Sequence, residues 1–250
     1  MIIYRSKIKD IIFEFTPPES EEKKGVIIIC DGLPSVPKQK DLMSYFSSQG
    51  FFVIYPRYSG TWESDGEFLK ESPTKDIEDI INLIKTGKII ELYADKEFNI
   101  ESGGIYLIGS SFGGAVALSL AESKNISKVV ALSPIVDFKR HNNQGGEQDL
   151  NWLSGFILKA FGQGYRFDNS NWKKMIKGEI FNPPQELKLK KETSMKILIL
   201  YDKSDESVDY KKIKDYSSKN GIKTIETENI GHLSFSKLSD EIKNKIIDWF

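Results

Sequence analysis

Short, continuous apolar runs recur along the 250-residue chain, with polar or amphipathic stretches between them. Most of these runs show no alternation of polar and apolar positions, which is typical of strands buried on both faces of a sheet. The pattern predicts such strands over residues 25–30, 51–55, 105–108, 128–132 and 196–201, and a weaker one over 223–226. Residues 2–15 alternate instead, which favours a half-exposed antiparallel hairpin or edge strand.

The stretches between the apolar runs carry helical spacing. In residues 76–90, isoleucines at 77, 80, 81 and 84 share one face of a predicted helix, and residues 38–49, 211–219 and 239–250 show similar patterns. Small and apolar residues after position 111 also continue at helical spacing. Buried strands that alternate with amphipathic helices form βαβ units, so we expect an α/β fold with a mostly parallel sheet.

One long segment interrupts this alternation. Residues 137–194 are rich in aromatic and polar side chains, among them Trp152, and lack an apolar run of the strand type. An unstructured loop of this length is uncommon in a compact domain. We therefore expect one domain over residues 1–250, with a helical insertion at about 137–194 that caps a site at the carboxyl ends of the strands. The alternative is a surface excursion whose aromatics pack on the core.

The composition of the chain argues against several classes of partner and cofactor. The chain has 35 basic and 36 acidic residues and a formal net charge of −1, so no basic field indicates nucleic acid or anionic lipid. The one cysteine, Cys30, excludes an internal disulfide and a cysteine-based zinc site. No apolar run is long enough to span a membrane, and the amino terminus lacks the pattern of a secretory signal. We expect a cytoplasmic protein without metal or organic cofactor, and the sequence does not predict its oligomeric state.

The most informative motif is Gly109-Ser110-Ser111-Phe112-Gly113, which joins a predicted strand to a predicted helix. Serine at the centre of G-x-S-x-G in this context is the pattern of a nucleophile elbow. The glycines fit this interpretation, because strand and helix pass too closely there for side chains. The alternative is a Gly/Ser-rich turn without chemistry.

A serine nucleophile requires a base and an acid that orients the base. The chain offers two histidines, and only His232 fits the order serine, acid, base, since His141 lies inside the insertion. The acid is expected on the loop that follows residues 196–201. Spacing alone leaves Asp202, Asp205 and Glu206 as candidates.

Together these residues resemble the α/β-hydrolase superfamily, and within it the small serine peptidases and esterases related to prolyl-oligopeptidase-like and dienelactone-hydrolase-like proteins. Residues 202–209 align with the G-x-x-D-x-x-V-P pattern of that branch, with Asp209 in place of the proline. This alignment implies that Asp205 is the acid and keeps Asp202 as the alternative. Gly231-His232 followed by Phe235 resembles the G-H-x-x-F ending of the branch and supports His232 as the base.

The resemblance also implies an oxyanion hole and a substrate pocket. The backbone N–H of Phe112 supplies one donor and that of Leu33 the other, because Asp31-Gly32-Leu33-Pro34 stands where relatives carry H-G-x-x and proline has no N–H. Asp31 either steers a cationic substrate group or ties down its loop. Arg57 resembles an arginine that lines the pocket in these hydrolases. The alternative is that Arg57 pairs with a nearby carboxylate and fixes its loop. Trp152 of the cap is expected to contact substrate.

We therefore expect a serine hydrolase that cleaves a small carboxylic ester through Ser111, His232, Asp205 and an acyl-enzyme. The alternative within the enzyme class is an aminopeptidase or acylaminoacyl-type peptidase that acts on a short peptide. A non-catalytic binding protein with a hydrolase fold is the alternative of another class, because fold and function are separable.

Overall fold

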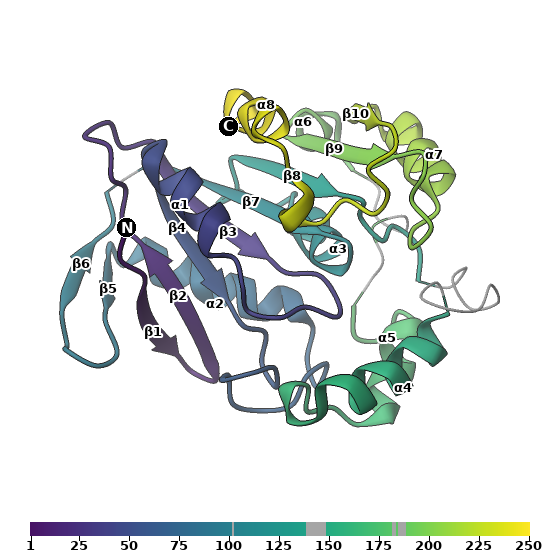
Figure 1. The fold of residues 1–250 in the computed structure, drawn as a ribbon, viewed down its shortest axis with the longest axis horizontal. Helices are drawn as coiled ribbons and strands as arrows, with labels where there is room; N and C mark the ends of the chain where they lie inside the picture. Colours follow the sequence, from purple (N-terminus) through teal and green to yellow (C-terminus); the bar gives the residue numbers. More distant parts are fainter. Residues whose placement is uncertain (102, 139–148, 182–183, 185–188) are drawn as a thin grey trace.

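A computed structural model describes residues 1–101, 103–138, 149–181, 184 and 189–250, and eight of its strands form one sheet (Figure 1). Their order across the sheet is β1-β2-β4-β3-β7-β8-β9-β10. The strands are β1 (Tyr4–Ile8), β2 (Ile11–Thr16), β3 (Gly25–Cys30), β4 (Phe51–Pro56), β7 (Gly104–Ser110), β8 (Lys128–Leu132), β9 (Ile197–Asp202) and β10 (Lys223–Thr227). All the strands expected from the apolar runs are present.

The sheet is parallel from β4 to β10 and antiparallel at the other end, where β1 pairs with β2 and β2 with β4. The register aligns Cys30 with Gly109 and Ser110 with Leu132, so neighbouring strands finish at a common edge. The loops that follow β3, β7, β9 and β10 therefore all leave the sheet on the same side. This is the edge at which parallel sheets bind their ligands.

Helices cover both faces of the sheet, which explains why central strands such as β3 and β4 are apolar and buried along their whole length. In β3, Val26 and Ile28 pack into one cluster of buried residues, while Ile27 and Ile29 pack into the other. The helices α1 (Lys40–Ser48) and α8 (Asp240–Trp249) bury their apolar sides in the second cluster. The helices α2 (Pro73–Lys85), α3 (Phe112–Ser119) and α7 (Tyr210–Asn220) do so in the first.

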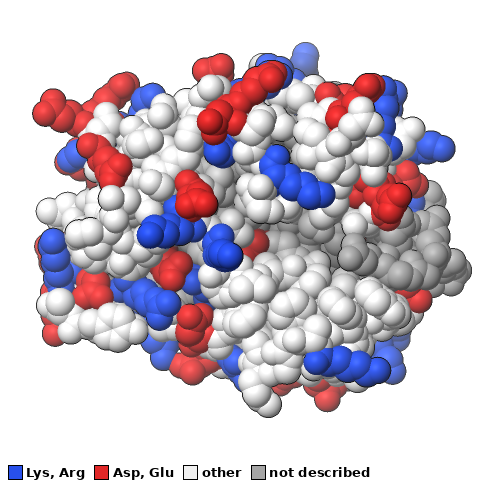
Figure 2. Space-filling view, in the orientation of Figure 1, with Lys and Arg blue, Asp and Glu red and all other residues white. Residues whose placement is uncertain are grey.

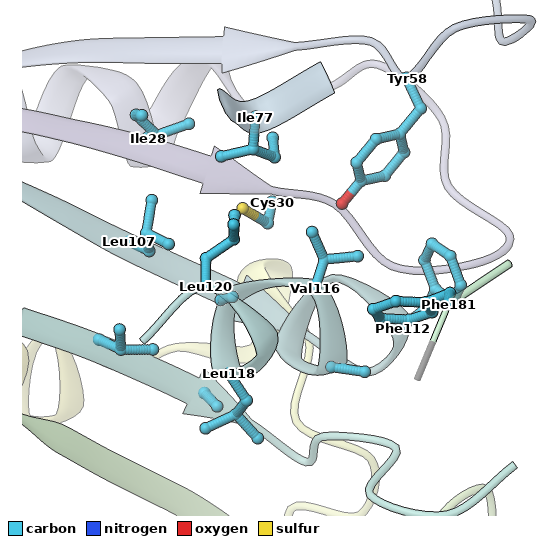
Figure 3. Close-up of a cluster of buried hydrophobic side chains, with 14 of the residues drawn as sticks. Ile28, Cys30, Tyr58, Ile77, Leu107, Phe112, Val116, Leu118, Leu120 and Phe181 are labelled. Carbon is cyan, nitrogen blue, oxygen red and sulfur yellow. The ribbon is translucent and has the colours of Figure 1, made fainter. Parts of the chain in front are cut away.

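Helix α3 is the central helix of the first cluster. Its residues from Phe112 to Leu118 are all buried, and Figure 3 shows Val116 and Leu120 beside the side chains of Cys30 and Leu107. Burial raises the pKa of the Cys30 thiol, which stays protonated and packs as a small apolar group. The helix that follows the elbow is therefore fixed on the sheet by a dense apolar environment.

The insertion is helical in its described part, and its first two α-helices lie at the carboxyl edge of the sheet, whereas its last helix directly precedes β9 (Figure 1). It contains α4 (Leu150–Phe161), the 3₁₀ turn η2 (Gly162–Gly164), α5 (Asn169–Ile176) and α6 (Lys191–Ser194). Backbone hydrogen bonds attach the segment after α4 to the loop after β4: the Trp62 N–H donates to the Gly164 carbonyl, and the Arg166 N–H donates to the Gly60 carbonyl, each over 2.8 Å. The cap is thus joined to the core by main-chain contacts.

The structure differs from the sequence prediction at residues 88–90. The periodicity extends a helix to residue 90, but α2 ends at Lys85 and residues 88–90 form β5 (Lys88–Ile90). Gly87 has a φ of +76°, a conformation that terminates the helix. Strand β5 then pairs with β6 (Glu97–Asn99) in a small antiparallel hairpin that the sequence analysis did not predict.

Candidate active site

Ser111 lies at a sharp turn between β7 and α3. Its φ of 54° and ψ of −116° place a non-glycine residue in a strained backbone conformation, as at a nucleophile elbow. A Cβ on Gly109 would lie 2.1 Å from the Gly113 carbonyl oxygen, and one on Gly113 would lie 2.0 Å from that of Cys30. The two glycines of the motif are therefore required by close backbone contacts, as expected from the sequence.

The Ser111 side chain opens into a cavity of about 470 Å³ that His232 also lines. Ser111 is 8% exposed, so most of the residue is buried beneath the cavity that it lines. The described hydrogen bonds do not include one between the Ser111 hydroxyl and the His232 imidazole. In free enzymes such contacts are often longer than in the complex with substrate.

His232 and Asp205 lie on adjacent loops, after β10 and β9, and their side chains are paired. The distance from His232 Nδ1 is 2.9 Å to Asp205 Oδ2 and 3.2 Å to Oδ1. The backbone N–H groups of Ser207 and Val208 both donate to Asp205 Oδ1 over 2.9 Å, which fixes the carboxylate. When Nδ1 donates to this carboxylate, Nε2 is the ring nitrogen that is left to accept a proton.

Asp205 is held in its charged form. Burial alone raises the pKa of its carboxyl group, but the contact with His232 and a hydrogen bond from Ser133 outweigh burial, so the pKa lies below its ordinary value. A carboxylate that stays ionised near neutral pH can stabilise a positively charged imidazole. This is the electrostatic requirement for the acid of a serine triad.

Asp202, the alternative acid, is fully buried and turned toward other partners. Its Oδ1 accepts hydrogen bonds from the backbone N–H and the hydroxyl of Ser204, over 2.8 and 2.5 Å. Its Oδ2 accepts from the Thr227 hydroxyl and from the Ile230 N–H, over 2.8 and 3.1 Å. Asp202 therefore ties the two loops together, whereas Asp205 contacts the imidazole of His232.

The loop after β3 lies directly against the elbow. A Cβ on Gly32 would lie 3.4 Å from Ser111 Cβ, and the next residue, Leu33, lines the cavity. Among the described residues, neither the Leu33 N–H nor the Phe112 N–H donates a hydrogen bond to the protein. Phe112 begins α3, where backbone N–H groups have no partner within the helix. The expected roles of these two N–H groups as oxyanion donors stay predictions.

Asp31 fixes this loop from inside. Its carboxylate accepts hydrogen bonds from the Gly32 N–H over 3.1 Å and from the hydroxyl of Tyr55. Burial raises the pKa of Asp31 although these hydrogen bonds and the charge of Arg57 oppose that shift. Of the two roles expected for Asp31, the contacts fit the tying of the loop.

The cap holds the far end of the same loop, a contact that the sequence analysis missed. The Ser35 N–H donates to the Tyr165 hydroxyl over 2.9 Å, and that hydroxyl is 3.2 Å from the Ser35 carbonyl oxygen. Trp62 Nε1 donates to the same carbonyl over 3.1 Å. No spacing rule relates positions 35, 62 and 165, so only the folded cap reveals this arrangement.

Arg57 and Trp152 are not among the described residues that line the cavity. Arg57 is 3% exposed and pairs with Glu14 over 3.0 Å, because β2 is the direct neighbour of β4. This is the carboxylate pairing that the sequence analysis named as the alternative. Trp152 is 44% exposed and stacks on Phe156, which lines the cavity together with Leu153 of the same helix.

Three further expectations concern the second histidine, metal binding and membrane spans. His141 lies outside the described residues. Within the described part of the chain, no group of histidine, cysteine, aspartate or glutamate side chains is arranged to hold a metal ion. Its helices are all too short or too polar to cross a membrane.

Comparison with known proteins places the chain in a family. The model of the X-Pro dipeptidyl-peptidase family (S15) matches residues 14–223. Over 130 residues the chain is 30% identical to an Escherichia coli protein described as an uncharacterized 31.7 kDa protein in the traX-finO intergenic region. The match covers 51% of this chain and 43% of that protein, so the chain spans less than half the length of this curated relative.

Solved structures agree with the fold. The α/β hydrolase GrgF from Penicillium sp. sh18 superposes with a TM-score of 0.69 at 16% identity, covering 96% of this chain and 92% of that one. The esterase Pf2001 from Pyrococcus furiosus superposes with a TM-score of 0.63 at 14% identity, covering 99% and 90%. At these identities the likeness shows the fold, and the expected α/β-hydrolase fold is confirmed. Because the family match includes the elbow and most of the sheet, the chain belongs to the X-Pro dipeptidyl-peptidase (S15) family of α/β hydrolases.

Proposed function

We propose that this protein is a serine hydrolase that cleaves small carboxylic esters with an apolar group, through Ser111, His232 and Asp205. The observation that carries the proposal is the pairing of His232 with an ionised Asp205 at the cavity into which Ser111 opens. The N–H groups of Leu33 and Phe112, which donate to no other described group, are proposed to supply the oxyanion hole that acyl transfer requires.

The reaction follows from these positions. Ser111 Oγ forms a bond to the carbonyl carbon of the ester while its proton passes to His232 Nε2. The N–H groups of Leu33 and Phe112 stabilise the negative charge that develops on the carbonyl oxygen. Collapse of this intermediate breaks the bond to the leaving alcohol, which takes the proton from His232 and leaves an acyl-enzyme.

Water completes the cycle. It attacks the acyl carbon and gives a proton to His232 Nε2. Collapse of the second intermediate breaks the bond to Ser111 Oγ, which recovers the proton as the carboxylic acid leaves. Asp205 keeps the imidazole in the required tautomer throughout and stabilises its charged form.

The lining of the cavity supports an uncharged substrate. Among the described lining residues, the acidic and basic side chains besides His232 are Asp31 and Lys38. The carboxylate of Asp31 already accepts hydrogen bonds from Gly32 and Tyr55. An aminopeptidase or dipeptidyl peptidase has to hold a free N-terminal ammonium group, which calls for an available carboxylate. The family match favours peptidase activity as the second candidate, whereas this lining favours the ester.

Parallel assays separate the two activities. Purified protein is tested on p-nitrophenyl butyrate and on an alanyl-prolyl p-nitroanilide, together with Ser111→Ala. We expect hydrolysis of the ester, and a loss on the order of a millionfold in kcat on removal of the Ser111 hydroxyl. Near wild-type ester hydrolysis by Ser111→Ala, or hydrolysis of the anilide alone, contradicts the proposal.

A further inference from the structure

Apolar side chains and hydroxyl groups both line the cavity. Leu150, Leu153 and Phe156 of α4 form an apolar side of it. Ser207, Ser234 and Ser236, from the loops after β9 and β10, add hydroxyl groups elsewhere in the lining. The hydrocarbon chain of a substrate can therefore leave water by packing against α4.

The apolar side continues out of the cavity onto the surface of the cap. Phe156 lines the cavity and is 39% exposed, and its ring stacks on Trp152 with centroids 5.1 Å apart and an angle of 8° between the planes. Trp152 is 44% exposed and Val36 is 52% exposed. Phe156 thus connects the buried lining to an aromatic surface outside it.

The surface over the cap is also uncharged over a wide area. Figure 2 shows few Lys, Arg, Asp or Glu side chains over α4, at the lower right of the molecule, whereas charged side chains of both signs crowd the opposite side. Exposed aromatic groups that adjoin a ligand cavity are typical of binding surfaces. Their continuity with the cavity indicates that the ligand in the cavity extends across them.

We propose that Phe156 and Trp152 form a subsite for the outer part of an unbranched hydrocarbon chain of the ester, so that, beyond small esters, those whose chain extends out of the cavity are cleaved more efficiently. This inference rests on the proposed ester hydrolysis. The chain leaves water first against Leu153 and Phe156 inside the cavity and then against the face of the Trp152 ring. Each methylene group that leaves water raises kcat/KM by about two- to fourfold.

The test is a chain-length profile. Values of kcat/KM are measured for p-nitrophenyl esters from acetate to dodecanoate, and for butyrate esters of alcohols from methanol to octanol, which separates an acyl chain from an alcohol chain. We expect a continuous rise to octanoate or beyond in one of the two series. A profile that is highest at acetate or propionate, or flat in both series, overturns the subsite.

Variants of α4 locate the effect. Trp152→Gln is expected to lower the ratio of kcat/KM for decanoate over butyrate by about fivefold, because the outer part of the chain loses its apolar contact. Leu158→Gln is the matched control, since Leu158 is 36% exposed on the same helix and does not line the cavity. Equal ratios in wild type and Trp152→Gln contradict the inference.

If a second copy of the chain, rather than a substrate, covers Trp152 and Phe156, the experiments give a different result. If sedimentation shows a dimer that Trp152→Gln dissociates while the chain-length ratio is unchanged, the surface is an interface between copies of the chain and the subsite is excluded. A failure of the proposed function is distinguishable from either result. In that case the wild type hydrolyses none of the esters, or Ser111→Ala retains hydrolysis of every ester in the series.

Discussion

At the residue scale, the loop that presents the Leu33 N–H is held from both ends by side chains distant in sequence. Asp31 is bonded to Tyr55 inside the core, and Ser35 is bonded to Tyr165 of the cap. Burial raises the pKa of Tyr165, so its hydroxyl keeps its proton and can donate as well as accept. Such contacts determine where an oxyanion donor lies, and donor position strongly affects the rate of acyl transfer.

Tyr165→Phe tests this positioning role. The variant keeps the ring but leaves the Ser35 N–H without its acceptor, so the loop shifts away from the elbow. We expect kcat for p-nitrophenyl butyrate to fall by about tenfold, while KM changes by less than about twofold. Steady-state kinetics measure both constants.

Tyr45→Phe is the matched control, because the Tyr45 hydroxyl bonds Asn244 on an exposed surface outside the cavity lining. It should leave kcat unchanged. Loss of melting temperature with unchanged kcat in Tyr165→Phe contradicts the positioning role and leaves Tyr165 with a structural one.

At the element scale, the site depends on the two adjacent strands β9 and β10 and on the loops that leave them. Asp202, the last residue of β9, accepts hydrogen bonds from Ser204 and from Thr227 and Ile230. Burial opposes ionisation, but these hydrogen bonds outweigh it and lower the pKa of Asp202 to about 2 from 3.8. The carboxylate therefore links the loop of Asp205 to the loop of His232.

Asp202→Asn should destabilise the fold and displace this pair of loops. The N–H₂ group of an asparagine would face a group that now donates a hydrogen bond to the carboxylate. Two donors cannot bond to each other, so a buried hydrogen bond is lost. We expect the free energy of unfolding at pH 7 to fall by about 2 kcal/mol, measured by urea denaturation.

The pH dependence of this difference has a definite sign. Because the folded pKa is lower than the unfolded one, the stabilisation is present above about pH 4 and is lost as the pH falls toward 2. The gap between wild type and Asp202→Asn should therefore narrow on acidification. Glu228→Gln, at an exposed carboxylate that pairs with Lys203, serves as the control and should cost less than about 0.5 kcal/mol. A gap that widens below pH 4 contradicts this account.

At the scale of the whole molecule, the sheet and its helices could be predicted because burial on both faces leaves continuous apolar runs. The strand over residues 88–90 could not, since it is three residues long and its pattern continues the helix before it. The elbow and the partners of Ser111 followed from motif and chain order. Their geometry agrees with those expectations, while their roles in catalysis stay predictions.

The residues that line the cavity were harder to predict from the sequence. The pairing of Arg57 with Glu14 depends on the crossing of strand order that makes β2 a neighbour of β4. The exposure of Trp152 depends on which side of α4 packs on the core, and aromatic content alone does not determine this. Contacts between segments far apart in the chain carry no local pattern, and Tyr165 is a third example.

The most direct measurement of the central claim is intact-protein mass spectrometry after reaction with a fluorophosphonate, followed by peptide mapping. We predict one adduct per chain, located on Ser111, absent in Ser111→Ala and formed at least about a hundredfold more slowly in His232→Ala. An adduct on Cys30, or an active protein that forms no adduct, would contradict the account of Ser111 as a nucleophile activated by His232.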